Sequence, residues 1–201
     1  MPAMSRPRCP RCQRPQSHCL CPLIPRLPSH TRVLILQHPD ETRHALNTAR
    51  LAALGLCNAE LRIGERFAGL EQELAGRQAW LLFPGAQAQC VTTLPAAPAA
   101  GERLLLVPDG TWRKARLLLH CNPWLAALPR LCLPDGLESR YRLRKAPGPG
   151  ALSSIEAIVH CLNALEGEGR FDGLLRPFEA LIEAQIAAMG EDTYQRNHRR
   201  D

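Results

Sequence analysis

Hydrophobic positions along this chain fall into short runs and periodic stretches that predict strands alternating with helices. The short apolar runs, rich in branched side chains, predict strands over residues 32–37, 59–63, 79–83, 104–107 and 131–133. Apolar residues at helical spacing predict helices over residues 42–54, 67–74, 112–120, 153–165 and 174–189. Strands that alternate with helices build a mostly parallel sheet, so the predicted fold class is α/β.

The stretch at residues 104–116 combines the strongest strand signal with a cluster of polar groups. Four branched apolar residues predict a buried strand that Pro108 ends, and Asp109-Gly110 then turns the chain. Thr111 is suited to cap the helix that follows. The carboxyl edge of a parallel sheet is where α/β proteins bind ligands. The same residues also suit an ordinary capped turn, so the local pattern leaves both interpretations open.

Four of the nine cysteines crowd into a short segment near the N-terminus, namely Cys9, Cys12, Cys19 and Cys21. The spacing of the first pair is typical of zinc-binding segments, and four thiolates predict a tetrahedral structural zinc site. His18 is a candidate substitute ligand, and a redox pair or unligated thiols are the alternatives. The remaining cysteines lie among apolar residues and are expected to be small core residues: Cys57, Cys90, Cys121, Cys132 and Cys161.

Length and charge narrow the class of protein. A chain of 201 residues predicts one domain with a small appendage. We expect a zinc element and linker over residues 1–28, a main domain over 29–190 and a mobile basic tail over 191–201. The net charge of +6 and an isoelectric point near 9.0 favour a polyanionic partner such as nucleic acid.

The number and positions of the cysteines and the length of the apolar runs indicate the cellular compartment. The first eight residues contain no apolar signal segment, and no apolar run is long enough to cross a membrane. Clustered thiols in an odd total argue against a disulfide-bonded secreted protein. We therefore expect a cytoplasmic protein with no membrane partner. No obligatory protein partner is predicted.

A basic segment lies late in the chain, with four cations among residues 139–145. On a strand, alternation would place Arg140, Arg142 and Arg144 on one face, either as a solvated edge or as a phosphate-binding strip. The basic isoelectric point favours the strip. A Gly/Pro-rich loop at residues 146–150 follows, and Ser153 with Glu156 then forms a capping-box pattern that opens the next helix.

Several of these segments together resemble a known family. Residues 108–112, Pro-Asp-Gly-Thr-Trp, resemble the Asp-x-Thr-Trp signature of the DTW-domain family, the tRNA-uridine aminocarboxypropyltransferases. The cysteine array at residues 9–21, the Gln-His-Pro of residues 37–39 with Asn-Thr-Ala at 47–49, and the segments 141–144 and 152–157 resemble further family motifs. The resemblance covers about residues 9–165 and departs from the pattern at the Gly/Pro-rich residues 147–151.

The resemblance implies a SPOUT-like α/β fold with a C-terminal trefoil knot. It also implies S-adenosylmethionine as donor and tRNA as partner. The implied reaction transfers the 3-amino-3-carboxypropyl group, rather than methyl, to N3 of a uridine and releases methylthioadenosine. A SAM-dependent RNA methyltransferase and a non-catalytic zinc-containing RNA-binding module are the alternatives.

The implied site assigns roles to residues of several segments. Asp109 is expected to act as general base or to hold the amino group of the donor, and Trp112 to pack on the donor and exclude water. The full set of expected donor-binding residues is Phe83, Pro84, Pro108, Asp109, Gly110, Thr111, Trp112, Leu133, Leu152 and Ser153. The expected RNA-binding residues are Arg113, Lys114, Arg116, Arg140, Arg142, Arg144 and Lys145.

Overall fold

The chain folds around a six-stranded sheet whose strands all run parallel. The computed structural model describes residues 7–95, 103–143 and 151–198. The strand order is β2-β1-β5-β3-β6-β4. The strands are β1 (Arg32–Gln37), β2 (Ala59–Ile63), β3 (Gln78–Leu82), β4 (Gln89–Cys90), β5 (Arg103–Asp109) and β6 (Arg130–Cys132). The predicted α/β class is therefore confirmed.

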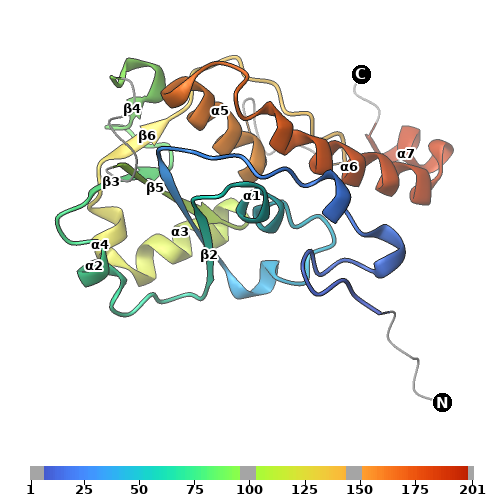
Figure 1. The fold of residues 1–201 in the computed structure, drawn as a ribbon, viewed down its shortest axis with the longest axis horizontal. Coiled ribbons are helices and arrows are strands. Elements are labelled where there is room, and N and C mark those ends of the chain that lie inside the picture. Colours follow the sequence, from blue (N-terminus) through green and yellow to red (C-terminus); the bar gives the residue numbers. More distant parts are fainter. Residues whose placement is uncertain (1–6, 96–102, 144–150, 199–201) are drawn as a thin grey trace.

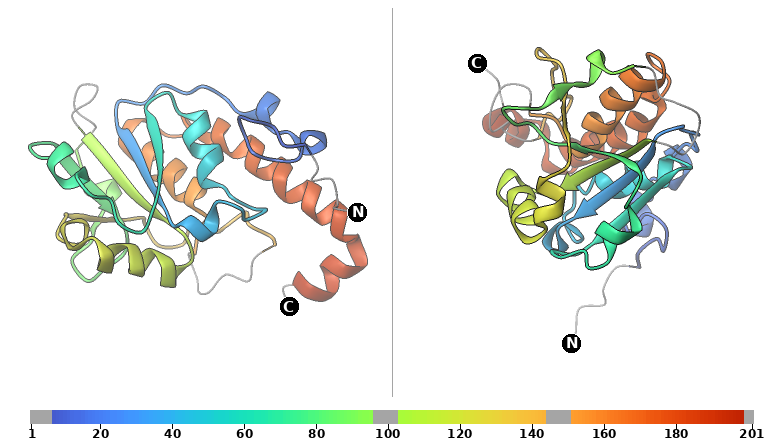
Figure 2. Two further views of the ribbon diagram at one scale, coloured as in Figure 1. Left: turned by 90° about the horizontal axis from the view of Figure 1, so that it is seen from below. Right: turned by 90° about the vertical axis from the view of Figure 1, so that its left-hand side faces the viewer.

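The described residues form seven α-helices, and six of them build a layer on each face of the sheet (Figure 1). One layer contains α1 (Ala49–Gly55), α5 (Ser154–Glu166) and α6 (Leu175–Met189). The other contains α2 (Leu70–Glu73), α3 (Trp112–Cys121) and α4 (Pro123–Ala126), and the views in Figure 2 agree with this arrangement. A final helix, α7 (Glu191–His198), follows α6.

The central strands bury side chains on both faces, which explains their continuous apolar runs. Val33 and Ile35 of β1 pack into the core beneath α1, α5 and α6, whereas Leu34 and Leu36 pack into the core beneath α2, α3 and α4. Successive side chains of a strand point to opposite faces, so a strand covered on both sides must be apolar throughout. The segment that carries the cysteine cluster adds Cys12 to the first core.

The strand predictions are confirmed to within one or two residues, with two differences. Pro108 does not end β5, because the strand continues its register with β1 through Leu36–Pro108 and Gln37–Asp109. The missing proline amide costs one donor without preventing the pairing. No strand was predicted between residues 83 and 104, but the described part of that segment contains β4, which pairs with β6.

The helix predicted from residue 42 begins only at Ala49. A 3₁₀ turn at Pro39–Glu41 comes first, and the side chains of His44 and Asn47 accept hydrogen bonds from the backbone amides of Leu46 and Arg50. Side chains that bond to nearby backbone in this way offer it an alternative to the helix. The prediction was wrong for residues 42–48 for this reason.

The strand considered for residues 139–145 is absent from the part that the structure describes, residues 139–143. The Ser139 hydroxyl and the Arg140 backbone amide instead donate to the carboxylate of Glu156 on α5, so these groups bond to a side chain rather than to a strand. Arg144 and Lys145, together with residues 146–150, lie outside the described residues.

The described part of the C-terminal tail forms α7 after Gly190 turns the chain with a φ of +83°. No helix was predicted there, and the mobility of the tail stays a prediction. Of the five cysteines expected in the core, only Cys161 is buried, and Cys57 is exposed because it lies in the turn before β2. Across the described residues, none of the helices is both long and apolar enough to cross a membrane.

Two neighbouring leucines of α3 test this packing. Leu118 is fully buried, whereas Leu117 is 38% exposed. We expect Leu118→Ala to lower the free energy of unfolding by about 2–5 kcal/mol, because it leaves a cavity. We expect Leu117→Ala to lower it by less than about 1 kcal/mol. Urea denaturation of both variants measures the difference, and equal losses would contradict the orientation of α3.

Candidate functional site

A buried carboxylate lies at the carboxyl edge of the sheet, where β1 and β5 end side by side. Asp109 is the last residue of β5 and pairs in register with Gln37, the last residue of β1. Its Oδ2 accepts a hydrogen bond of 2.7 Å from Gln37 Nε2, and its Oδ1 accepts one from Ser154 Oγ at the start of α5. The side chain is almost fully buried, with 8% of the residue exposed. Three segments distant in sequence therefore meet at this carboxylate.

The surroundings of Asp109 determine how readily it holds a proton. Burial raises the pKa of its carboxyl above the ordinary value, and the hydrogen bonds from Gln37 and Ser154 oppose that rise. The nearby Glu41 raises the pKa further, and His44 lowers it. The balance is a raised pKa, which suits a group that accepts a proton during a reaction.

Gln37 is itself fixed by a neighbour that follows the turn after β1. Its Nε2 donates to Asn47 Oδ1 at 3.2 Å, and Asn47 Nδ2 lies 3.4 Å from Gln37 Oε1. Asn47 also donates to the carbonyl of Glu41 at 3.1 Å. Gln37, Asn47 and Ser154 were not assigned to the site from the sequence, although all three lie in segments that resemble the family. The local signal that marks Gln37 is a polar residue directly after four apolar positions of a strand.

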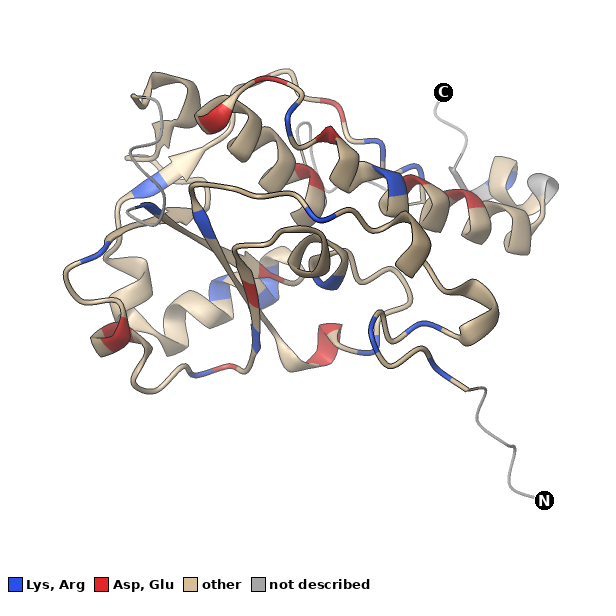
Figure 3. Cartoon of the chain, in the orientation of Figure 1, with Lys and Arg blue, Asp and Glu red and all other residues tan. Residues whose placement is uncertain are grey.

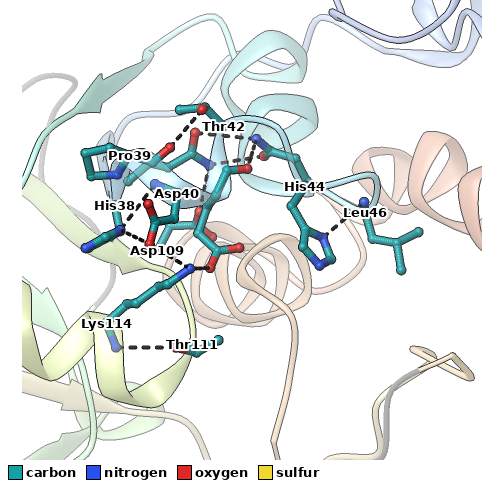
Figure 4. A network of polar contacts seen from close by, with 12 residues as sticks. His38, Pro39, Asp40, Thr42, His44, Leu46, Asp109, Thr111 and Lys114 are labelled. Carbon is teal, nitrogen blue, oxygen red and sulfur yellow. Dashed lines mark hydrogen bonds and ion pairs between the residues drawn. The ribbon is translucent and has the colours of Figure 1, made fainter.

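An ion-paired network ties the turn after β1 to the start of α3 (Figure 4). Lys114 Nζ lies 2.8 Å from Glu41 Oε1 and 3.5 Å from Asp40 Oδ2. The buried His38 places its Nε2 3.2 Å from a carboxylate oxygen of Glu65, and its backbone amide donates to the carbonyl of Asp109. Lys114, expected to contact RNA, therefore has its ammonium paired within the protein.

The turn between β5 and α3 has the predicted form. Gly110 has a φ of +154°, and a Cβ at this position would lie 3.0 Å from the Cβ of Lys114, so a side chain would crowd the turn. Thr111 caps α3, because its hydroxyl oxygen accepts a hydrogen bond from the backbone amide of Lys114. The cap prediction is confirmed.

Two aromatic rings lie next to this turn. Trp112, 37% exposed, makes an edge-to-face contact with Phe83 at a centroid distance of 5.6 Å. The guanidinium of Arg130 lies over the Phe83 ring at 5.8 Å. Gly85 leaves room for it, since a Cβ there would lie 2.8 Å from Nη1 of Arg130. The Trp112 ring is thus partly accessible to a ligand, and it follows the buried Asp109 by three residues in the sequence.

The remaining expected donor-binding residues surround the sheet edge at different depths. Pro84 is exposed, and Pro108, Leu133 and Leu152 are half-buried. Ser153 is buried and forms the predicted capping box: its hydroxyl caps α5, and Glu156 accepts from its backbone amide at 2.8 Å. Glu156 thereby anchors both the start of α5 and the preceding segment at Ser139.

The expected RNA-binding arginines divide into two groups. Arg113 and Arg116 are exposed on α3. Arg140 and Arg142, with side chains 60% and 52% exposed, form ion pairs with Glu179 and Glu183 of α6. Figure 3 shows basic residues on α3 and along the cysteine-bearing N-terminal segment.

The four N-terminal cysteines converge in space as their spacing predicts. All four Sγ atoms of Cys9, Cys12, Cys19 and Cys21 lie within 4.8 Å of one another, with Cys9 and Cys21 3.6 Å apart and Cys12 and Cys19 3.8 Å apart. Tetrahedral zinc with bonds of about 2.3 Å separates its sulfurs by about 3.8 Å, so the cluster fits this ion. His18 is exposed, its Nδ1 contacts Ser17, and it is not part of the cluster.

Comparison with known proteins shows which sequences this chain resembles. The DTW domain matches residues 6–186. The chain is 32% identical over 199 residues to tRNA-uridine aminocarboxypropyltransferase 2 of Macaca fascicularis and 32% identical over 196 residues to the protein of that name from Drosophila melanogaster. It is 28% identical over 193 residues to tRNA-uridine aminocarboxypropyltransferase A of Arabidopsis thaliana. No solved structure matches significantly.

The matched share of the sequence differs between these relatives. They cover 92% of this chain for the macaque and fly proteins and 80% for the plant protein. The chain spans 65% of the length of the macaque relative, 77% of the fly relative and 73% of the plant relative. Because the domain match includes the cysteine cluster, the central sheet and α5, the chain belongs to the DTW-domain family.

Proposed function

We propose that this chain transfers the 3-amino-3-carboxypropyl group of S-adenosylmethionine to N3 of a uridine in tRNA. The relatives whose names state a tRNA-uridine aminocarboxypropyltransferase support the reaction class. The observation that carries the proposal is the buried carboxylate of Asp109 beside an exposed aromatic ring at the carboxyl edge of the sheet. Such an edge is where a ligand meets the turns that follow parallel strands.

The proposed step needs one base and one correctly oriented carbon. Asp109 accepts the N3 proton of uridine, and the N3 electron pair attacks the γ-carbon of the donor. The bond between that carbon and the sulfonium sulfur breaks, and its electron pair leaves with methylthioadenosine. Because the sulfonium is already a good leaving group, the protein has to supply proton removal and positioning. In the alternative role, the carboxylate of Asp109 holds the ammonium group of the donor.

The residues around Asp109 suit a donor with an adenosine and an amino-acid end. In the proposal Trp112 and Phe83 pack on the donor and exclude water. The turn over residues 108–111 brings backbone groups near it, and Pro84, Leu133, Leu152 and Ser153 complete the donor site.

A basic surface is proposed to bind tRNA. Arg113 and Arg116 are exposed on α3 and lie in the same helix as Trp112. Arg140 and Arg142 extend the set from the segment before α5, and Arg144 and Lys145 are retained from the sequence. Contacts between cations and phosphates give RNA binding that weakens as salt is added.

The cysteine cluster is proposed to hold a structural zinc ion through all four thiolates. Backbone amides of Cys12 and Arg11 lower the pKa of the Cys9 thiol to about 6. The cluster packs through Cys12 on the core beneath α5, so a bound ion would brace the N-terminal segment there. The SPOUT-like assignment, the C-terminal knot, the three-part domain division and a cytoplasmic location belong to the same proposal.

The co-product of the reaction tests the proposed function. Purified protein incubated with S-adenosylmethionine and unmodified tRNA is expected to release methylthioadenosine, which chromatography separates from S-adenosylhomocysteine. Release of S-adenosylhomocysteine would identify a methyltransferase instead. Binding of tRNA with neither product would favour a non-catalytic RNA-binding module.

Asp109→Asn is expected to reduce the transfer rate by at least about 100-fold, because an amide cannot accept the proton. The fold should survive, since the Asn oxygen can accept from Gln37 while its amide donates to Ser154 Oγ. Single-turnover assays measure the rate, and circular dichroism monitors the fold. Asp135→Asn changes an exposed carboxylate in the same way and should leave the rate unchanged. A folded Asp109→Asn variant with the wild-type rate would remove Asp109 from the site.

Metal analysis of the purified protein is expected to find about one zinc ion per chain. Changing Cys9 and Cys12 together to serine should abolish zinc binding and lower the thermal midpoint. Cys57→Ser, at an exposed cysteine outside the cluster, should change neither. Full zinc content in the double variant would contradict the four-thiolate site.

A further inference from the structure

Both oxygens of the Asp109 carboxylate are bonded to other side chains of the protein. Gln37 Nε2, from β1, donates to Oδ2, and Ser154 Oγ, from the first residue of α5, donates to Oδ1. The two donors come from residues 72 and 45 positions away in the sequence. A carboxylate has about four lone-pair directions, so one remains on each oxygen for a substrate.

The amide of Gln37 has one orientation that satisfies all of its neighbours. Gln37 is fully buried, and Asn47 faces it with both an acceptor and a donor. Turning the amide over would bring its oxygen against the oxygens of Asp109 and Asn47, leaving acceptors face to face. Asn47 is held in turn by the Glu41 carbonyl and the Arg50 amide. Gln37 is therefore fixed as a donor to Asp109.

Ser154 is fixed by the helix that it begins. The capping box of Ser153 and Glu156 sets the first turn of α5, and Ser154 lies within that turn. The start of a helix carries a partial positive charge, which also favours a nearby carboxylate. Ser154 is not needed for the cap, so its hydroxyl remains available for Asp109.

The charged groups around Asp109 stabilise its ionised form less than the hydrogen bonds from Gln37 and Ser154 do. Glu41, in the turn after β1, opposes ionisation of Asp109, although its own charge is paired with Lys114 of α3. His44 favours ionisation but is the smallest of the influences. Burial is the largest influence and opposes ionisation. The two hydrogen bonds are thus the principal groups that favour the charged carboxylate.

We propose that Gln37 and Ser154 are positioning residues, whose two hydrogen bonds keep Asp109 ionised and hold it in one orientation toward the uridine. This role rests on the proposed function, in which Asp109 accepts the N3 proton. The bonds act on the carboxylate and leave the donor and the RNA to other residues. Their loss should therefore change kcat and its pH dependence while the KM for S-adenosylmethionine stays close to that of the wild type.

Ser154→Ala tests the proposal through the pH profile of single-turnover transfer. Removing a donor to a charged group destabilises the ionised carboxylate, so its pKa rises. We expect the acid limb to move to higher pH by about one unit and the rate near that limb to fall about tenfold. Ser154→Thr keeps the hydroxyl and should restore the wild-type profile.

Ser139→Ala is the matched control, because it removes a serine hydrogen bond to another carboxylate, that of Glu156. It can lower the rate through the start of α5, but it should leave the position of the acid limb unchanged. An equal shift of the limb in Ser139→Ala and Ser154→Ala would overturn the proposal. So would a wild-type profile in Ser154→Ala.

A titration that needs no turnover separates this proposal from the proposed function. The ¹³C signal of the Asp109 carboxyl, followed by NMR in the free protein, should titrate at higher pH in Ser154→Ala than in the wild type. Gln37→Leu should also raise the pKa of Asp109. Gln37→Glu keeps the size of the side chain and should raise the pKa of Asp109 further, because it adds a like charge. If folded variants titrate at the same pH as the wild type, the positioning role of Gln37 and Ser154 is overturned. If the variants show the expected pKa changes but the wild-type protein transfers no group to tRNA, only the proposed function is overturned.

Discussion

The desolvation of the Asp109 carboxylate is the constraint on which the rest of the site depends. A buried charge is costly unless hydrogen bonds satisfy it, and this one lies at the end of the central strand with 8% of the residue exposed. The chain meets the requirement with one donor from β1 and one from α5. The two hydrogen bonds to Asp109 therefore form only when the register of β1 with β5 and the position of α5 are both correct.

The surrounding polar groups extend this arrangement outward in a consistent way. Asn47 orients Gln37, and Lys114 binds the turn after β1 to α3 through Glu41. Lys114 is consequently occupied within the protein, whereas Arg113 and Arg116 remain exposed on the same helix. Neighbouring cations of one short segment thus differ in their surroundings, and under the proposed function the exposed pair is the better candidate for contact with phosphate.

Local pattern was sufficient for most of the fold, for the cysteine cluster and for the capped turn that follows Asp109. The apolar runs predicted five strands, the spacing of Cys9, Cys12, Cys19 and Cys21 predicted a cluster that the structure contains, and Thr111 caps α3 as expected. Each of these features depends on residues close together in sequence.

Features that depend on distant residues were not predicted. Gln37 and Ser154 join Asp109 across 72 and 45 positions, and no local pattern records such a contact. The strand considered around Arg140 does not form, because the backbone amide of Arg140 donates instead to the carboxylate of Glu156, 16 positions later. Mass spectrometry of tRNA nucleosides from cells with and without this chain tests the proposed reaction. A uridine carrying the 3-amino-3-carboxypropyl group is expected only in cells that have the chain, and identical nucleosides in both would contradict the proposed reaction.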